Sequence, residues 1–92
     1  MNFSFALDAC KKGSKITRRG WSGTGQYVVY RSGYPDGIPI SKSTAEDTGL
    51  PEGTVCKFAP YLMFQDAHGV FVPWLASQGD LLAEDWECVK LF

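Results

Sequence analysis

The sequence predicts an α+β fold, with a small twisted antiparallel β-sheet, an N-terminal helix and a short C-terminal helix before the last strand. Short segments rich in β-branched and aromatic residues recur along the chain. They are not linked by the regular strand–helix–strand alternation that would indicate a parallel sheet. A length of 92 residues leaves room for one domain, residues 1–92.

The first helix is predicted within residues 2–13. Asn2 or Ser4 would cap its N-terminus, and Gly13 would end it. Four apolar residues follow the i, i+3, i+4, i+7 spacing that places side chains on one buried face. They are Phe3, Ala6, Leu7 and Cys10.

Two strands, residues 15–18 and 26–31, are predicted next, joined by the glycine-rich loop 20–25. This loop lacks the Gly-Lys-Ser/Thr sequence of a phosphate-binding loop and does not open a strand–helix unit. Its three glycines therefore predict a turn.

Residues 32–53 hold four glycines and three prolines, so we expect a long and mostly irregular insertion. One helical turn is predicted at residues 43–49, capped by Ser43 with Glu46 in the capping-box position and ended by Gly49. Loops of this length are often functional, which makes the insertion a candidate lid or subunit contact.

The rest of the chain predicts extended segments at 55–58, 61–65 and 70–75, followed by a last strand at 86–91. Asp66 and Gly69 occupy the first and fourth positions of a type I turn, which predicts a hairpin. Ser77 with Asp80 three residues later is the signature of a helix start.

Composition and charge argue against several classes of protein. The net charge of −1 argues against a nucleic acid polymer as partner. No run of about 18 apolar residues exists, and the N-terminus has no basic start, so we expect no membrane span, no signal peptide and a cytosolic location. Three widely spaced cysteines fit neither a disulfide framework nor a metal knuckle. The small core makes oligomerisation plausible.

Charge is unevenly distributed. Residues 11–19 include five basic side chains, and residues 80–87 include four acidic ones. Two interpretations stay open: solvated faces that attract each other within or between subunits, or a basic strip that faces phosphate.

Catalytic signals are weak. His68 is the single histidine in the sequence and falls in a predicted turn, and carboxylates at a helix start usually act as caps. Nothing brings a cysteine and an orienting group beside His68. We therefore predict no catalytic residues, no metal and no cofactor.

Residues 73–86 carry the strongest binding signal. They combine a rigid aromatic residue, a helix N-terminus that favours anions, and several hydrogen-bonding side chains. Tryptophan can stack on a nucleotide base, while amides and carboxylates bind ribose hydroxyls. The alternative is that Trp74 and Trp86 are core aromatics and that Ser77 with Asp80 is a plain capping box.

Motifs along nearly the whole chain resemble the Thoeris anti-defence type two family of phage proteins. The matching pattern includes Phe3-x-x-Ala6-Leu7, Arg18-x-Gly20-Trp21, Leu50-Pro51-x-Gly53-Thr54, Pro60-Tyr61-Leu62-Met63, and Pro73-Trp74-x-Ala76-Ser77-Gln78-x-Asp80-Leu81-Leu82-Ala83-x-Asp85-Trp86. Phe5 departs from the polar residue usual in relatives.

The resemblance implies a sponge that acts in the cytoplasm of the infected bacterium. Family members bind a cyclic ADP-ribose isomer (glycocyclic ADP-ribose) that TIR-domain enzymes make during Thoeris immunity, and they do not degrade it. Some relatives also bind cyclic dinucleotides. Relatives form homotetramers with ligand held between subunits.

On this basis we assign ligand-binding roles to eight residues. Trp21 and Trp74 would wall the adenine or its ribose, and Ser77, Gln78 and Asp80 would meet ligand oxygens. Arg18 would offset the diphosphate charge, and Asp85 and Trp86 would contact the ligand or support the site. Two competing hypotheses are a module that binds another protein through residues 32–53 and a nucleotide-processing enzyme.

Overall fold

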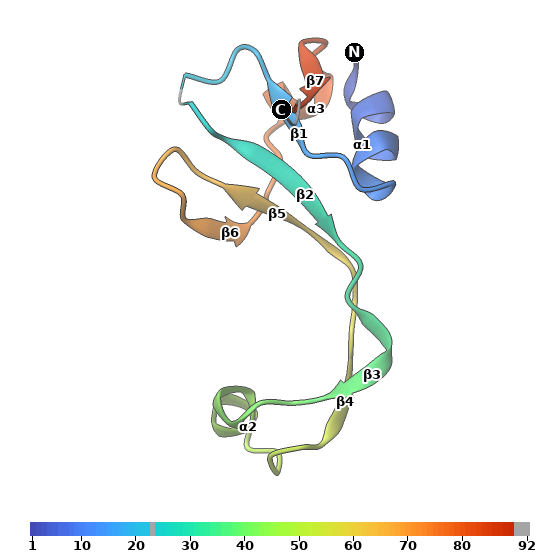
Figure 1. Ribbon diagram of the computed structural model, residues 1–92, viewed down its shortest axis with the longest axis vertical. Helices are drawn as coiled ribbons and strands as arrows, with labels where there is room; N and C mark the ends of the chain where they lie inside the picture. The colour runs from blue at the N-terminus through green and yellow to red at the C-terminus, as the bar shows by residue number, and fades with distance from the viewer. Residues whose placement is uncertain (23, 90–92) are drawn as a thin grey trace.

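The computed structural model describes residues 1–22 and 24–89, and it confirms the α+β class. It divides into a body and an extended arm (Figure 1). The body consists of α1 (Phe3–Lys11), β1 (Ile16–Arg18), β2 (Tyr27–Arg31), β5 (Tyr61–Gln65), β6 (Phe71–Pro73), α3 (Gln78–Leu82) and β7 (Trp86–Cys88). The arm consists of β3 (Tyr34–Pro39), α2 (Lys42–Thr48) and β4 (Val55–Phe58).

The body is one five-stranded antiparallel sheet in the order β6-β5-β2-β1-β7. The longest pairing joins β2 to β5, where Val28 lies opposite Phe64 and Tyr30 opposite Leu62. Residues directly opposite each other share a face of the sheet. Leu62 and Phe64 pack against the core, so Tyr61 and Met63 lie on the other face.

Helix α1 covers the core face of the sheet. The Asn2 side chain caps it by accepting a hydrogen bond from the Phe5 N–H at 3.0 Å, which confirms the first of the two predicted caps. Gly13 follows the helix with a φ of 109°, a conformation that favours glycine. Ala6 and Cys10 are buried against Ile16, as the helical spacing predicted.

Trp86 fills the centre of the body and is 1% exposed. Three aromatic side chains surround it, with ring centroids 5.3 to 5.9 Å from its own. They are Phe3, Trp21 and Trp74. Tilted and edge-to-face contacts of this kind contribute about 0.5–1.5 kcal/mol each beyond area burial. The indole of Trp86 therefore packs β7 against α1 and against the segments that carry the other two indoles.

The hairpin prediction is confirmed, although β6 is shorter than expected. The Gly69 N–H donates to the Asp66 carbonyl at 3.0 Å, and the Asp66 carboxylate accepts from the N–H groups of His68 and Val70. Strand β6 covers residues 71–73 instead of 70–75. Strand β7 covers residues 86–88, and the predicted continuation to 90 and 91 lies outside the described residues.

The arm corrects the prediction that residues 32–53 are mostly irregular. Residues 34–39 form a strand that pairs with β4, with a bulge between Tyr34 and Ile38. Proline is tolerated because a two-stranded ribbon has free edges, and Gly37 takes a φ of 97° at the bulge. Ser41, not the predicted Ser43, caps α2 by accepting from the Thr44 N–H. Gly49 ends the helix with a φ of 78°, as predicted.

The arm makes the protein elongated. Its radius of gyration is 15.8 Å, against about 12 Å expected for a compact domain of this length. Ile40 and Ala45 are the arm's buried hydrophobic residues, whereas four large apolar side chains there are exposed. These are Tyr34, Leu50, Val55 and Phe58. Within residues 1–22 and 24–89, no helix has the length and apolar character needed to cross a bilayer.

Candidate ligand-binding site

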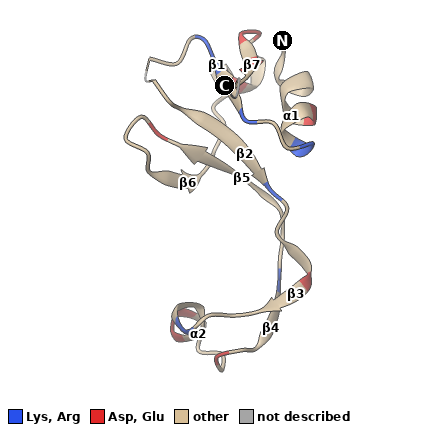
Figure 2. Ribbon diagram, viewed as in Figure 1, with Lys and Arg blue, Asp and Glu red and all other residues tan. Residues whose placement is uncertain are grey.

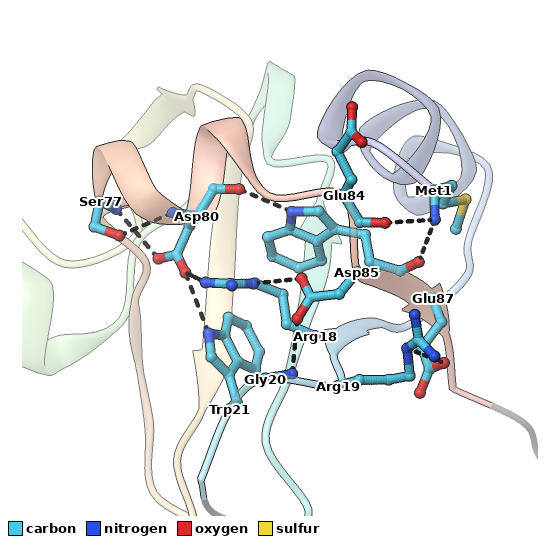
Figure 3. A network of polar contacts seen from close by, with 11 residues as sticks. Met1, Arg18, Arg19, Gly20, Trp21, Ser77, Asp80, Glu84, Asp85 and Glu87 are labelled. Atoms are coloured by element: carbon cyan, nitrogen blue, oxygen red, sulfur yellow. Dashed lines mark hydrogen bonds and ion pairs between the residues drawn. The ribbon is translucent and has the colours of Figure 1, made fainter.

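Arg18, at the end of β1, holds two acidic residues from the other end of the chain (Figure 3). Its Nε donates to Asp85 Oδ1 at 2.8 Å, and its Nη1 donates to Asp80 Oδ1 at 2.9 Å. The three side chains are largely shielded from solvent. One cation therefore faces two anions, which leaves this group with a net charge of −1.

Asp80 takes part both in the capping box of α3 and in the ion pair with Arg18. Its Oδ2 accepts from the Ser77 N–H at 3.2 Å, while Ser77 Oγ accepts from the Asp80 N–H at 3.0 Å. This reciprocal pair is the capping box that the sequence predicted. Asp80 Oδ1 also accepts from Trp21 Nε1 at 3.2 Å. The carboxylate thus ties α3 to β1 and to the loop that follows β1.

Asp85 fastens the loop after β1 to the segment between α3 and β7. Its Oδ2 accepts from the Gly20 N–H at 2.7 Å, and its carbonyl accepts from the Arg19 N–H at 3.2 Å. A Cβ at position 20 would lie 2.7 Å from Asp85 Oδ2, which is too close for any other residue without a shift. This contact favours glycine at position 20, since a Cβ there would push the Asp85 carboxylate away.

Both carboxylates have lowered pKa values. Burial alone would raise the pKa of Asp80, but hydrogen bonds from Arg18, Trp21 and Ser77 outweigh it. The hydrogen bond from Arg18 is the main cause that lowers the pKa of Asp85, and the Gly20 N–H adds to it. The two acids in turn raise the pKa of Arg18. At neutral pH the group is fully ionised.

The three indoles have different exposures. Trp86 is buried and donates from Nε1 to the Asp80 carbonyl at 2.8 Å. Trp21 and Trp74 are half-buried and meet Trp86 edge to face, at interplanar angles of 79° and 82°. Trp21 also meets Phe64 edge to face. Trp21 and Trp74 thus flank the buried indole and keep part of their surface accessible.

The structure brings six of the eight predicted residues into one network of hydrogen bonds and ion pairs, which we call the Arg18 cluster. Its members are Arg18, Trp21, Ser77, Asp80, Asp85 and Trp86. Trp74 joins this cluster through its contact with Trp86. Gln78 is exposed on the first turn of α3.

This geometry bears on two of the expected roles. Arg18 already balances two carboxylates, so a ligand phosphate would have to compete with both. The N-terminus of α3 is occupied by the Asp80 carboxylate, and α3 is only five residues long. An anion is therefore disfavoured there, whereas hydroxyl groups and base edges are compatible with Asp80. Trp86 is buried and packs against Trp21 and Trp74, the core position that was the alternative to ligand contact.

The basic and acidic segments pair within the chain. Figure 2 shows basic residues at both ends of β1, the strand that pairs with β7. Besides the Arg18 pairs, Arg19 lies 3.9 Å from Glu87. Lys12 pairs with Asp8, and Lys15 lies over the ring of Tyr27 at 4.6 Å. This pairing favours the interpretation of mutually attracting faces over a phosphate-facing strip.

A cleft of about 390 Å³, which was not predicted, lies where the arm leaves the body, and we call it the neck cleft. None of the eight predicted residues lines it. It forms between segments that are far apart in sequence, so the available signal was only the aromatic residues and Arg31 at strand ends. Over the described ranges, no three acidic, cysteine or histidine side chains are grouped to hold a metal ion.

These features define the class of protein: a small α+β protein with one helix-backed antiparallel sheet, a projecting arm and an ion-paired cluster beside two accessible indoles. The chain belongs to the Thoeris anti-defense 2-like family, whose model matches residues 1–89. It is similar to Thoeris anti-defense 2 of Bacillus phage SP01, with 30% identity over 93 residues that cover 98% of this chain and 96% of the relative. The family resemblance seen in the sequence is confirmed.

Proposed function

We propose that this protein is a phage-encoded sponge that inhibits bacterial Thoeris immunity. It would bind a cyclic ADP-ribose isomer, glycocyclic ADP-ribose, made by a TIR-domain enzyme, and hold it unchanged in the cytoplasm of the infected host. Membership of the Thoeris anti-defense 2-like family supports the anti-Thoeris role. The observation that carries the ligand assignment is the pair of half-buried indoles, Trp21 and Trp74, beside the Arg18 cluster.

The Arg18 cluster suits a preorganised binding surface. Trp21 is fixed by its hydrogen bond to Asp80 and by its edge contacts with Trp86 and Phe64, so it loses little freedom when a base stacks on it. Stacking of a base on an aromatic side chain contributes about 1–3 kcal/mol. Ser77, Gln78 and Asp80 lie at the same end of α3, where they would meet ribose hydroxyls and base edges.

The electrostatics favour binding over catalysis. A general acid or base works best with a pKa near the operating pH. Asp80 and Asp85 have their pKa values moved the opposite way, because Arg18 and N–H donors stabilise the charged carboxylates. At neutral pH these carboxylates accept hydrogen bonds and neither donate nor take up a proton.

The exposed apolar surface of the arm supports assembly as a homotetramer. Tyr34, Val55 and Phe58 are exposed on a two-stranded ribbon, which is marginally stable alone in water. Covering them with a second copy would stabilise the arm. A ligand of this size needs a pocket of roughly 300–1,000 Å³. Subunits that meet beside Trp21 and Trp74 would close such a pocket.

The sponge hypothesis is tested by depletion and release. The protein is incubated with glycocyclic ADP-ribose and, in parallel, with cyclic dinucleotides, and free ligand is measured before and after heat denaturation. We expect depletion of the cyclic ADP-ribose isomer and full recovery of the same compound on heating. An altered product would indicate an enzyme, and no depletion would refute binding.

Two variants test the assignment to the indoles. Trp74→Leu keeps an apolar side chain against the core but removes the stacking surface, so we expect weaker binding by about tenfold or more. Phe71→Ala removes another exposed aromatic residue of the same hairpin and is the matched control. Full affinity in a folded Trp74→Leu variant would refute the stacking role.

The alternative, a module that binds a different protein through the arm, predicts another outcome. In that case the purified chain would be monomeric and would bind none of these ligands.

A further inference from the structure

Trp21, one of the two accessible indoles of the proposed ligand site, lies in the loop that follows β1 (Figure 3). Loop residues are mobile unless packing and hydrogen bonds restrict them. On the core side the Trp21 ring is restricted by its edge contacts with Trp86 and Phe64. The polar end of the indole and the backbone before it are held by other contacts, and all of these involve Arg18 or its two acidic partners.

The backbone before Trp21 is held mainly by Asp85. Its Oδ2 accepts from the Gly20 N–H at 2.7 Å, and its carbonyl accepts from the Arg19 N–H at 3.2 Å. The Trp21 N–H donates to the Arg18 carbonyl at 3.2 Å, which closes a tight turn. The N–H groups of residues 19–21 therefore all have acceptors, and two of these acceptors belong to Asp85.

The indole N–H of Trp21 is held by Asp80. Trp21 Nε1 donates to Asp80 Oδ1 at 3.2 Å, and the same oxygen accepts from Arg18 Nη1 at 2.9 Å. The other oxygen of this carboxylate accepts from the Ser77 N–H at 3.2 Å. Arg18 thus helps to fix the carboxylate to which the indole is bonded.

The guanidinium of Arg18 links the two sets of contacts. Its Nε donates to Asp85 and its Nη1 to Asp80, so one planar group orients the carboxylate that holds the loop backbone and the carboxylate that holds the indole. A lysine ammonium is a single point charge on a flexible stem and cannot reproduce this geometry. The Arg18 side chain is 22% exposed, and two acids already balance its charge. It is poorly placed to attract a phosphate.

We propose that Arg18 is a positioning residue, which orients the Trp21 indole for stacking through Asp80 and Asp85 and does not itself bind the ligand. This inference rests on the proposed function. It differs from the sequence-based expectation that Arg18 offsets the diphosphate charge. A lysine at position 18 separates the two roles, because pairing with phosphate needs positive charge, whereas positioning needs two donors in one plane.

The affinity for glycocyclic ADP-ribose tests the role in two variants. Arg18→Gln and Arg18→Lys should both weaken binding by about fivefold or more, the factor that corresponds to about 1 kcal/mol of lost stacking. Arg19→Gln is the matched control, because the Arg19 side chain is 73% exposed and pairs with Glu87 at the surface. This control should leave the affinity unchanged. Full affinity in Arg18→Lys alone would assign Arg18 to phosphate and overturn the proposal.

A double-mutant cycle shows whether Arg18 acts through Trp21. In a Trp21→Leu background, Arg18→Gln should change the affinity by less than about twofold, because the indole that Arg18 positions is absent. An equal loss in both backgrounds would mean that Arg18 acts on the ligand independently of Trp21, which would overturn the proposal.

Hydrogen exchange of the indole N–H groups, followed by NMR without ligand, separates orientation from general stability. Trp86 Nε1 donates to the Asp80 carbonyl at 2.8 Å, a backbone acceptor that remains in the Arg18 variants. Exchange should therefore become faster for Trp21 in Arg18→Gln and stay unchanged for Trp86. Equal acceleration at both indoles would indicate a purely structural role. If Arg18→Gln does not fold, Arg18→Lys, which keeps the charge, gives the same comparison.

Failure of the proposed function would give a different result. In that case the unchanged chain would not bind glycocyclic ADP-ribose, and the role of Arg18 in binding would be refuted with it. If the unchanged chain binds the ligand and a folded Arg18→Gln variant binds it equally well, the positioning role alone is overturned.

Discussion

Removal of the Asp80 carboxylate should destabilise the body more than any change to a surface charge. The side chain is 13% exposed and accepts hydrogen bonds from Arg18, Trp21 and the Ser77 N–H. The Asp80→Ala variant keeps the Ser77 cap, because the N–H of residue 80 still donates to Ser77 Oγ. It loses the hydrogen bonds that the carboxylate accepts, and loss of a hydrogen bond to a charged group removes about 1.5–3 kcal/mol. For Asp80→Ala we therefore expect about 3 kcal/mol in the free energy of unfolding.

Thermal unfolding followed by circular dichroism measures this effect. A loss of about 3 kcal/mol lowers the Tm by roughly 12–24 °C in a domain of this size. Protein concentration must be held fixed, because assembly would raise the Tm. Asp8→Ala is the control, since Asp8 is 66% exposed and pairs with Lys12 on the surface of α1. That variant should change stability by less than about 0.5 kcal/mol. Equal Tm losses in the two variants would refute the structural role of the Arg18 cluster.

Three further predictions concern pH, thiol reactivity and the neck. The pKa values of Asp80 and Asp85 are lowered in the folded protein, so the unfolded chain takes up protons at higher pH than the folded protein does. The free energy of unfolding should therefore be level above about pH 5 and fall below about pH 4. Acid titration of the Tm checks this, and an unchanged slope in Asp80→Asn would contradict it. Burial raises the pKa of the Cys10 thiol, so mass spectrometry after native alkylation should find Cys88 modified well before Cys10; equal rates would be inconsistent with the fold. Gly33→Ala should destabilise the arm, because a Cβ clashes with the Ala59 backbone and the φ of 68° disfavours alanine; a Tm equal to that of the unchanged chain would exclude a rigid neck.

Local signals were sufficient to predict most of the body. The spacing of apolar residues in α1, the Asp66–Gly69 turn and the Ser77 cap each act within a few residues of the chain. The arm was mispredicted because its glycines and prolines are typical of loops. A bulged two-stranded ribbon with free edges accepts the same residues. Its pairing with β4 is a tertiary contact that no local pattern of residues 32–53 contains.

In the candidate site, too, the local contacts were predicted and the contacts between distant residues were not. The capping box between Ser77 and Asp80 was predicted because the two residues are three apart. The bond between Arg18 and Asp80 spans 62 residues, and the uneven charge of the sequence indicated attraction between the two segments without specifying partners. The neck cleft was not predicted, since its lining is assembled from strands of both the body and the arm.

The central claim is that an assembly of subunits binds the messenger and leaves it intact. Native mass spectrometry of the full chain mixed with glycocyclic ADP-ribose tests this claim most directly. We expect a tetramer whose mass increases by whole multiples of the unmodified ligand and returns to its original value when the ligand is released. A monomer with no added mass, or an added mass that differs from that of the ligand, would contradict it.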